Sequence, residues 1–150
     1  MDRIIIENKK AYFNYEILEK FEAGIVLAGH EVKSAKSGKI SLLGSYIAIK
    51  DQEPHLIGCK ISPYQPKNVP SDYNPSRPRK LLLNKEEIKY LVGKSRQKGL
   101  TLAPLRVYTK KGKIKIEFGL AKGRKKTNKK ELIKKRAADR EIERELKTRG

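Results

Sequence analysis

Residues 105–120 carry the pattern that most restricts the fold, because apolar and polar side chains alternate along them with one interruption. Leu105 and Val107 alternate with polar neighbours, and after Lys111-Gly112 the alternation resumes from Ile114 to Leu120. A period of two is typical of a strand with one buried face. A short Lys-Gly connection favours a tight turn between two such strands. The pattern therefore predicts an antiparallel hairpin with one apolar face for the core and one face of Lys, Arg and Tyr.

Shorter patterns predict further strands and short helices. The expected elements are a strand pair over residues 11–27 with a bend at Glu22-Ala23-Gly24, a helix over 30–36, a hairpin with strands at 43–49 and 55–61, and a helix from an Asn84 cap to Gly99. Five of the seven prolines fall in residues 62–79, which indicates an extended loop. The spacing favours a mainly β fold with short helices (α+β), a small antiparallel β-barrel of the oligonucleotide-binding-like type, closed or partly open.

Positive charge is distributed unevenly along the 150 residues. The net charge is +1 in residues 1–60, +10 in residues 61–120 and +8 in residues 121–150. Such an asymmetry indicates a polyanionic partner. Nucleic acid is favoured over a membrane surface, because the basic C-terminal segment has no aromatic residue to bury in lipid.

The C-terminal segment is expected to form a separate unit. Its apolar positions make a stripe too thin to pack on a core, and its charge density is typical of disorder. We therefore expect a nucleic-acid-binding β-barrel domain over residues 1–123 and a basic tail over residues 124–150, disordered alone and helical when phosphates neutralise it. The alternative is a solvated tail that only increases solubility.

Other classes of protein are disfavoured. The apolar runs are too short for a membrane span, and no signal peptide is recognisable, so a cytoplasmic location is expected. A single cysteine, Cys59, fits a reducing compartment. Nucleotide-binding, serine-hydrolase and metalloprotease motifs are missing from the sequence, so no enzyme, cofactor or metal site is expected. An RNA-modifying enzyme that uses Cys59, His30 or His55 remains an alternative.

Charged residues at two places are candidates for RNA contact. Arg77, Arg79 and Lys80 end the proline-rich loop, and guanidinium groups can bind phosphate bidentately. Glu22 and Glu31 are carboxylates in a protein expected to bind a polyanion. Acceptance of base amino groups would explain them, and pairing with a nearby lysine such as Lys33 is the alternative.

Five separated motifs together resemble a known family. They are Asn8-Lys9-Lys10-Ala11, Glu22-Ala23-Gly24-Ile25, Gly29-His30-Glu31-Val32-Lys33-Ser34, Arg77-Pro78-Arg79-Lys80-Leu81-Leu82-Leu83 and Leu120-Ala121-Lys122-Gly123-Arg124-Lys125. In this order and spacing they resemble the tmRNA-binding proteins of bacterial trans-translation, the small protein B family. The resemblance covers nearly the whole chain from about Asn8.

The resemblance implies a β-barrel similar to the oligonucleotide-binding fold, without enzymatic activity. It implies binding to the tRNA-like domain of tmRNA and delivery of that RNA, with elongation factor Tu, to 70S ribosomes stalled on truncated mRNA. The implied RNA-facing residues are Asn8, Glu22, Leu82 and Lys115, and the implied hinge into the tail is Lys122, Gly123, Arg124 and Lys125. A structural ribosomal protein, or another rRNA-binding protein, is the alternative.

The tail is implied to reach the decoding centre of the small subunit and to lie in the empty mRNA channel. The tail residues expected to contact the ribosome are Lys126, Thr127, Asn128, Lys129, Lys130, Lys134, Lys135 and Arg136. Thr127 stands where the family usually has Tyr or His, so the ring that could stack on a base is missing. Asp72-Tyr73 likewise stands where Asn-His is usual.

Overall fold

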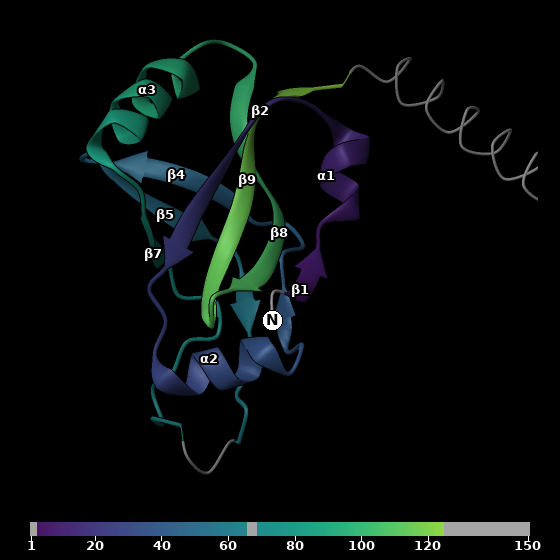
Figure 1. Ribbon diagram of the computed structural model, residues 1–150, viewed down its shortest axis with the longest axis vertical. Coiled ribbons are helices and arrows are strands. Elements are labelled where there is room, and N and C mark those ends of the chain that lie inside the picture. The colour runs from purple at the N-terminus through teal and green to yellow at the C-terminus, as the bar shows by residue number, and fades with distance from the viewer. Residues whose placement is uncertain (1–2, 66–68, 125–150) are drawn as a thin grey trace, which may run out of the picture.

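Nine strands and three short helices make up the described part of the computed structural model, residues 3–65 and 69–124 (Figure 1). In chain order they are β1 (Arg3–Glu7), α1 (Lys9–Asn14), β2 (Tyr15–Ile25), α2 (Gly29–Lys36), β3 (Ile40–Ser41), β4 (Tyr46–Lys50), β5 (Glu53–Ile57), β6 (Lys60–Ile61), β7 (Arg79–Leu82), α3 (Lys85–Ser95), β8 (Leu100–Lys110) and β9 (Lys113–Gly123). None of these helices has the length and apolar character that a membrane crossing requires.

Seven strands form one antiparallel sheet in the order β1-β8-β9-β2-β7-β5-β4, and β3 pairs separately with β6. The mainly β composition with short helices is as predicted. The sheet is not closed into a barrel, because β1 and β4 are its two outer strands. It nevertheless curves around its core until β4 lies against β8, and this contact is made without strand pairing. The helices α2 and α3 lie at opposite ends of the curved sheet (Figure 1).

The long hairpin is confirmed as β8 and β9, which pair from Leu100↔Lys122 to Lys110↔Lys113. Its turn residues Lys111 and Gly112 have φ values of 51° and 78°. Positive φ at both central residues matches the tight turn whose twist suits a hairpin. The apolar side chains of β9, including the fully buried Ile116 and Phe118, face the main core.

The prediction for residues 11–27 is wrong in two respects. Residues 11–14 belong to helix α1, because Ala11 packs as a small buried side chain against Ala103, Leu105 and Ala121. Residues 15–25 form one continuous strand, and its irregularity lies between Ile17 and Glu19 instead of at residues 22–24. The alternating aromatic residues therefore came from a helix followed by a strand.

The other predicted elements are confirmed with shifted ends. Helix α2 spans Gly29–Lys36, and β4 and β5 form the expected hairpin. The cap of α3 is confirmed, since the Asn84 side chain accepts a hydrogen bond of 2.8 Å from the backbone N–H of Glu87. This helix ends at Ser95, before the expected Gly99.

Candidate nucleic-acid interface

Strand pairing brings distant residues together on the outer face of the sheet. Gly24 of β2 is paired with Leu82 of β7 on one side and with Lys115 of β9 on the other, and Lys115 is in turn paired with Tyr108 of β8. Directly paired residues point to the same side of a sheet. We call the surface formed by Glu22, Leu82, Tyr108, Lys110 and Lys115 the sheet face.

A glycine allows this face to pack closely. A Cβ atom on Gly24 would lie 3.5 Å from Leu82 and 3.7 Å from the Nζ atom of Lys115. Because Gly24 has no side chain, those two side chains approach each other above β2. Leu82 is 57% exposed there, which leaves an apolar surface beside a cation.

Glu22 is held at the centre of the sheet face. Its Oε2 atom accepts a hydrogen bond from the Tyr108 hydroxyl, and the Lys110 ammonium lies 3.3 Å from Oε1 and 3.4 Å from Oε2. The Tyr108 hydrogen bond and the nearby Lys110 and Lys115 charges lower the pKa of Glu22, against a smaller opposing effect of burial. The lowered pKa keeps Glu22 ionised at neutral pH. Because a carboxylate has about four acceptor positions, Glu22 can accept further hydrogen bonds from a ligand.

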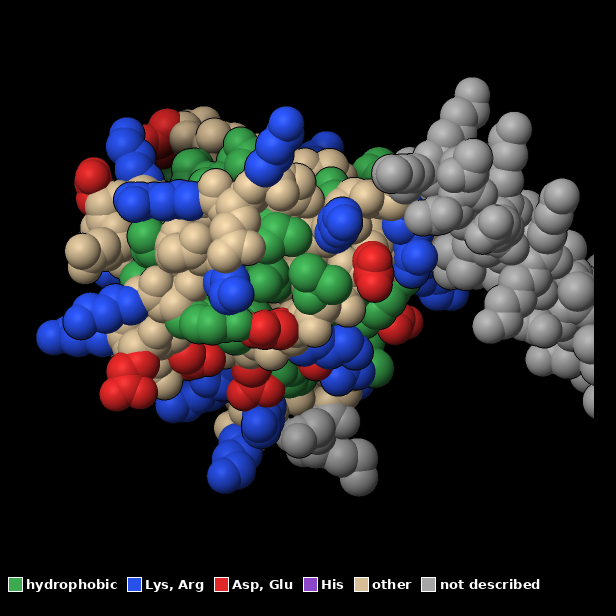
Figure 2. All heavy atoms as spheres, turned by 90° about the horizontal axis from the view of Figure 1, so that it is seen from above, with side chains coloured by type: hydrophobic (Ala, Val, Ile, Leu, Met, Phe, Trp, Pro, Cys, Tyr) green, Lys and Arg blue, Asp and Glu red, His purple; other side chains and the backbone are tan. Residues whose placement is uncertain are grey.

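A second row of charges extends the sheet face. Arg106 of β8 donates to Glu117 of β9 at 3.1 Å, and its guanidinium lies 5.4 Å from the centre of the Tyr108 ring. Lys20 reaches Glu117 from β2 at 4.0 Å. Figure 2 shows a similar mixture on another side of the molecule, where Asp and Glu side chains stand among Lys and Arg and hydrophobic side chains are exposed between them. The expected residue set missed Arg106, Tyr108 and Lys110, although their alternation with buried residues in β8 was the available signal.

The prediction that Glu31 and Arg79 contact RNA directly is wrong, because both side chains are completely buried (0% exposed). Glu31 accepts hydrogen bonds from Arg77, from Arg79 at 2.6 and 3.0 Å, from Tyr73 at 3.1 Å and from the backbone N–H of Ala28 at 2.9 Å. We call these four side chains the Glu31 cluster. Burial alone would raise the pKa of Glu31, but the hydrogen bonds from Arg77, Ala28 and Arg79 lower it to about 2.

The Glu31 cluster ties the proline-rich loop to the domain. Arg79 also donates to the carbonyl oxygens of Cys59 at 2.7 Å, Pro75 at 2.9 Å and Arg77 at 3.0 Å. The single hydroxyl hydrogen of Tyr73 is shared between Glu31 and the carbonyl oxygen of Ile61, which lies 2.8 Å from the hydroxyl oxygen. A buried guanidinium that is fully hydrogen-bonded and paired with a carboxylate has a structural role. The arginine motif at the end of this loop therefore positions the loop, and only Arg77 is partly exposed.

The remaining expected residues occupy other places. Lys33 is exposed on α2, and Lys80 is exposed on β7 with its ammonium 3.7 Å from Glu53. Asn8 donates its amide to the carbonyl of Pro104 at 3.0 Å beside α1. Lys122 lies at the far end of β9 from Lys115.

The backbone N–H of Arg124 donates a hydrogen bond of 2.9 Å to the carbonyl oxygen of Asn14, the last residue of α1. Asn8, Lys122 and Arg124 thus form a second group near α1, apart from the sheet face. Lys125 and the tail residues from Lys126 to Arg136 lie outside the described residues.

The three candidates for catalysis have other surroundings. Cys59 is completely buried, and burial raises the pKa of its thiol to about 11. The rings of His30 and Tyr73 are nearly perpendicular, with their centres 4.7 Å apart, and His55 lies on β5 paired with Lys80. Among residues 3–65 and 69–124, His, Cys, Asp and Glu side chains do not gather in threes as a metal site requires.

Comparison with known proteins identifies the family. The model of the family described as SmpB protein matches residues 5–148. The chain belongs to the SmpB family. Members of the SmpB family are RNA-binding proteins and not enzymes, so the expected resemblance and the expected class of protein are both confirmed.

Individual relatives are similar in sequence to this chain over almost its full length. The SsrA-binding protein of Carboxydothermus hydrogenoformans is 52% identical over 99% of this chain and 99% of its own length. The SsrA-binding protein of Sulfurihydrogenibium sp. is 49% identical over 97% of this chain and 95% of its own length. A chain of the solved structure "tmRNA-SmpB: a journey to the center of the bacterial ribosome" is 47% identical, with a TM-score of 0.67 over 81% of this chain and 85% of that chain.

Proposed function

We propose that this protein binds the tRNA-like domain of tmRNA and helps deliver it, with elongation factor Tu, to 70S ribosomes stalled on truncated mRNA in the cytoplasm. Membership of the SmpB family supports the proposal, as do relatives that are SsrA-binding proteins. The observation that carries it is the sheet face, where Glu22, Leu82 and Lys115 meet from three strands that are distant in sequence.

The side chains of the sheet face suit a folded RNA. Lys115 and Lys110 supply cations for phosphates, which dominate affinity but carry no sequence information. Leu82 offers an apolar surface for a sugar or base, and ionised Glu22 can accept hydrogen bonds from base amino groups. Lys80 adds a phosphate contact on the same side of β7 as Leu82, and Lys33 on α2 and the exposed part of the Arg77 side chain add further phosphate contacts.

A second set of contacts is proposed near α1 and in the tail. Asn8, Lys122, Arg124 and Lys125 extend RNA binding from the domain, residues 1–123, toward the basic tail, residues 124–150. The tail is proposed to be disordered in the free protein and helical in the vacant mRNA channel, close to the decoding centre. Its cations would neutralise rRNA phosphates there.

Gel-shift titration tests the RNA-binding half of the proposal. The protein should prefer a transcript of the tRNA-like domain to an unrelated duplex of equal length, and with six to ten phosphate contacts its affinity should fall by roughly 10³ to 10⁵ between 50 and 200 mM salt. Lys115→Glu combined with Lys122→Glu should weaken binding strongly. The charge-matched control, Lys85→Glu combined with Lys89→Glu on α3, should weaken it less. Equal effects of the two pairs would refute the assignment of the binding surfaces.

Peptide tagging on stalled ribosomes tests the tail. Removal of the residues after Lys126 should leave binding to the tRNA-like transcript nearly intact and abolish tagging, because the ribosome contacts are assigned to the removed segment. A large loss of RNA affinity in the truncated protein would contradict this division between domain and tail.

A further inference from the structure

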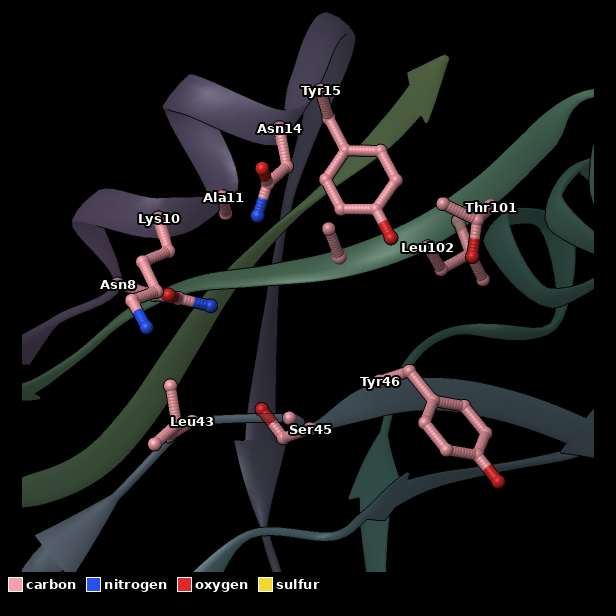
Figure 3. A pocket seen from close by; sticks show the side chains of 12 residues that line it. Asn8, Lys10, Ala11, Asn14, Tyr15, Leu43, Ser45, Tyr46, Thr101 and Leu102 are labelled. Carbon is pink, nitrogen blue, oxygen red and sulfur yellow. The ribbon is translucent and has the colours of Figure 1, made fainter. Parts of the chain in front are cut away.

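A cavity of about 390 Å³ lies beside α1, away from the sheet face (Figure 3). Residues of α1 and the start of β2 line one side, the turn before β4 lines the other, and Thr101, Leu102 and Ala103 of β8 form the floor. This volume is at the lower end of the range of roughly 300 to 1,000 Å³ that is usual for small-ligand sites. Two of the three floor residues, Leu102 and Ala103, are apolar, and both are buried.

Two tyrosines border the cavity. In Figure 3 the Tyr15 ring points toward the strand that forms the floor, whereas the Tyr46 ring lies at the rim and points away from α1. Tyr46 is 50% exposed and the neighbouring Leu43 is 65% exposed, so the wall before β4 is open to a ligand from solvent. An exposed aromatic ring beside an apolar floor can stack on the flat face of a nucleobase.

Polar groups in the cavity can hydrogen-bond the edge of a base. The amide group of Asn14 points into the cavity (Figure 3), and the hydroxyl group of Thr101 lies at its end. Ser45 uses its hydroxyl hydrogen for the carbonyl of Leu42 at 2.6 Å, which leaves its oxygen as an acceptor. The cavity therefore combines a stacking surface with hydrogen-bonding groups, as sites for unpaired bases do.

The one charged residue among the described residues that line the cavity is a cation, Lys10, which favours an anionic ligand. The chain beside it also carries charge, because the backbone of Arg124 is bonded to Asn14 and Lys122 is paired with the acidic Glu16 in the next strand. A ligand with a neutral ring and a phosphate would match the aromatic wall and this charge together.

We infer that the cavity binds one unpaired base of the RNA, stacked on Tyr46, with its phosphate toward Lys10. This inference rests on the proposed function, because it takes the RNA ligand from there. It adds a base-binding site that is separate from the sheet face, so the RNA would be held at two places on the domain.

Binding of the full chain to the tRNA-like transcript provides the first test. Tyr46→Ala should weaken binding by roughly 5- to 150-fold, the usual effect of losing one stacked base, without changing the salt dependence. Tyr46→Phe keeps the ring and should bind almost as the unchanged protein does. The matched control is Tyr90→Ala, which removes a similarly exposed tyrosine from α3 and should have little effect. Equal binding by Tyr46→Ala and the unchanged protein would overturn the inference.

A short single-stranded RNA carrying 2-aminopurine provides a second test that does not depend on tmRNA. Stacking on Tyr46 should change the fluorescence of this base in the unchanged protein and in Tyr46→Phe, but not in Tyr46→Ala. An identical response of all three proteins would overturn the base site even if the preference for the tRNA-like transcript holds. Loss of that preference with an intact Tyr46-dependent response would overturn the proposed partner and leave the base site supported.

Discussion

Glu31→Gln should destabilise the domain far more than its small change in shape suggests. Both carboxylate oxygens of Glu31 accept hydrogen bonds: Oε1 from Ala28 and Arg77, and Oε2 from Arg79, Tyr73 and Arg77. A glutamine supplies one oxygen, and its NH₂ group would face N–H donors at the other position. The change also leaves the completely buried Arg79 without its counter-charge.

Two estimates of the cost agree. Removing one partner of a buried ion pair costs about 3 to 5 kcal/mol. The pKa of Glu31 is lowered from 4.5 to about 2, and this difference corresponds to about 3 kcal/mol of stability at neutral pH. For a domain of this size such a loss should lower the Tm by roughly 10 °C or more.

The same residue predicts how stability depends on pH. As the pH falls below 4.5, the carboxyl of the unfolded chain takes up a proton while the folded one stays ionised down to about 2. The contribution of Glu31 is therefore complete above 4.5 and is lost as the pH falls toward 2. Urea unfolding followed by circular dichroism between pH 2 and 7 should show a shallower acid loss in Glu31→Gln than in the unchanged protein.

An exposed glutamate provides the control. Glu53 is 55% exposed and lies 3.7 Å from Lys80, and exposed pairs contribute about 0 to 1 kcal/mol. Glu53→Gln should therefore change the free energy of unfolding only slightly. If Glu31→Gln melts within about 3 °C of the unchanged protein, or loses stability in acid just as steeply, the stabilising role of the Glu31 cluster is refuted.

One labelling experiment and two substitutions test the packing of the core and the helices. Cys59 should resist thiol reagents at pH 8 until the protein is unfolded in urea, because a pKa of about 11 leaves roughly 10⁻³ of it as thiolate; fast labelling of the folded protein would contradict this. Gly119→Ala should lower the free energy of unfolding by about 1 to 3 kcal/mol, since its Cβ would lie 2.8 Å from Ile17 and 3.3 Å from Leu105. In Gly93→Ala, on α3, the added Cβ meets nothing within 4 Å, so this change should raise the free energy of unfolding by about 0.5 to 1 kcal/mol. If urea titrations show Gly119→Ala to be more stable than Gly93→Ala, crowding at Gly119 and helix propensity at Gly93 are both excluded as explanations.

Elements defined by local chemistry could be predicted from the sequence. The β8–β9 hairpin follows from a period of two and a Lys-Gly turn, and the start of α3 follows from an Asn84 cap. In both cases the residues that decide the structure are close in sequence. The grouping of Glu22, Leu82 and Lys115 was implied by the family resemblance, and alternation alone could not have supplied it, because the register of β7 against β2 depends on long-range pairing.

Features that depend on tertiary contacts were not predictable in the same way. The sequence cannot show that Ala11 fits against Ala103 and Ala121, and this packing favours a helix where the aromatic pattern suggested a strand. Nor does it show that β4 stops beside β8 without pairing, which leaves the sheet open. The cavity beside α1 could not be predicted for the same reason, because its walls come from segments that are far apart in the chain.

The Glu31 cluster changes how the charge of the protein should be counted. A sum over residues 61–120 treats Arg77 and Arg79 as cations available to RNA, whereas both are paired with Glu31 and Arg79 is completely buried. The positive charge that a ligand can reach on the domain therefore comes mainly from lysines, among them Lys110 and Lys115 on the sheet face. Because these lysines lie on a different part of the domain from Glu31, their substitution should change the salt dependence of RNA binding and leave the Tm nearly constant. Glu31→Gln should do the reverse.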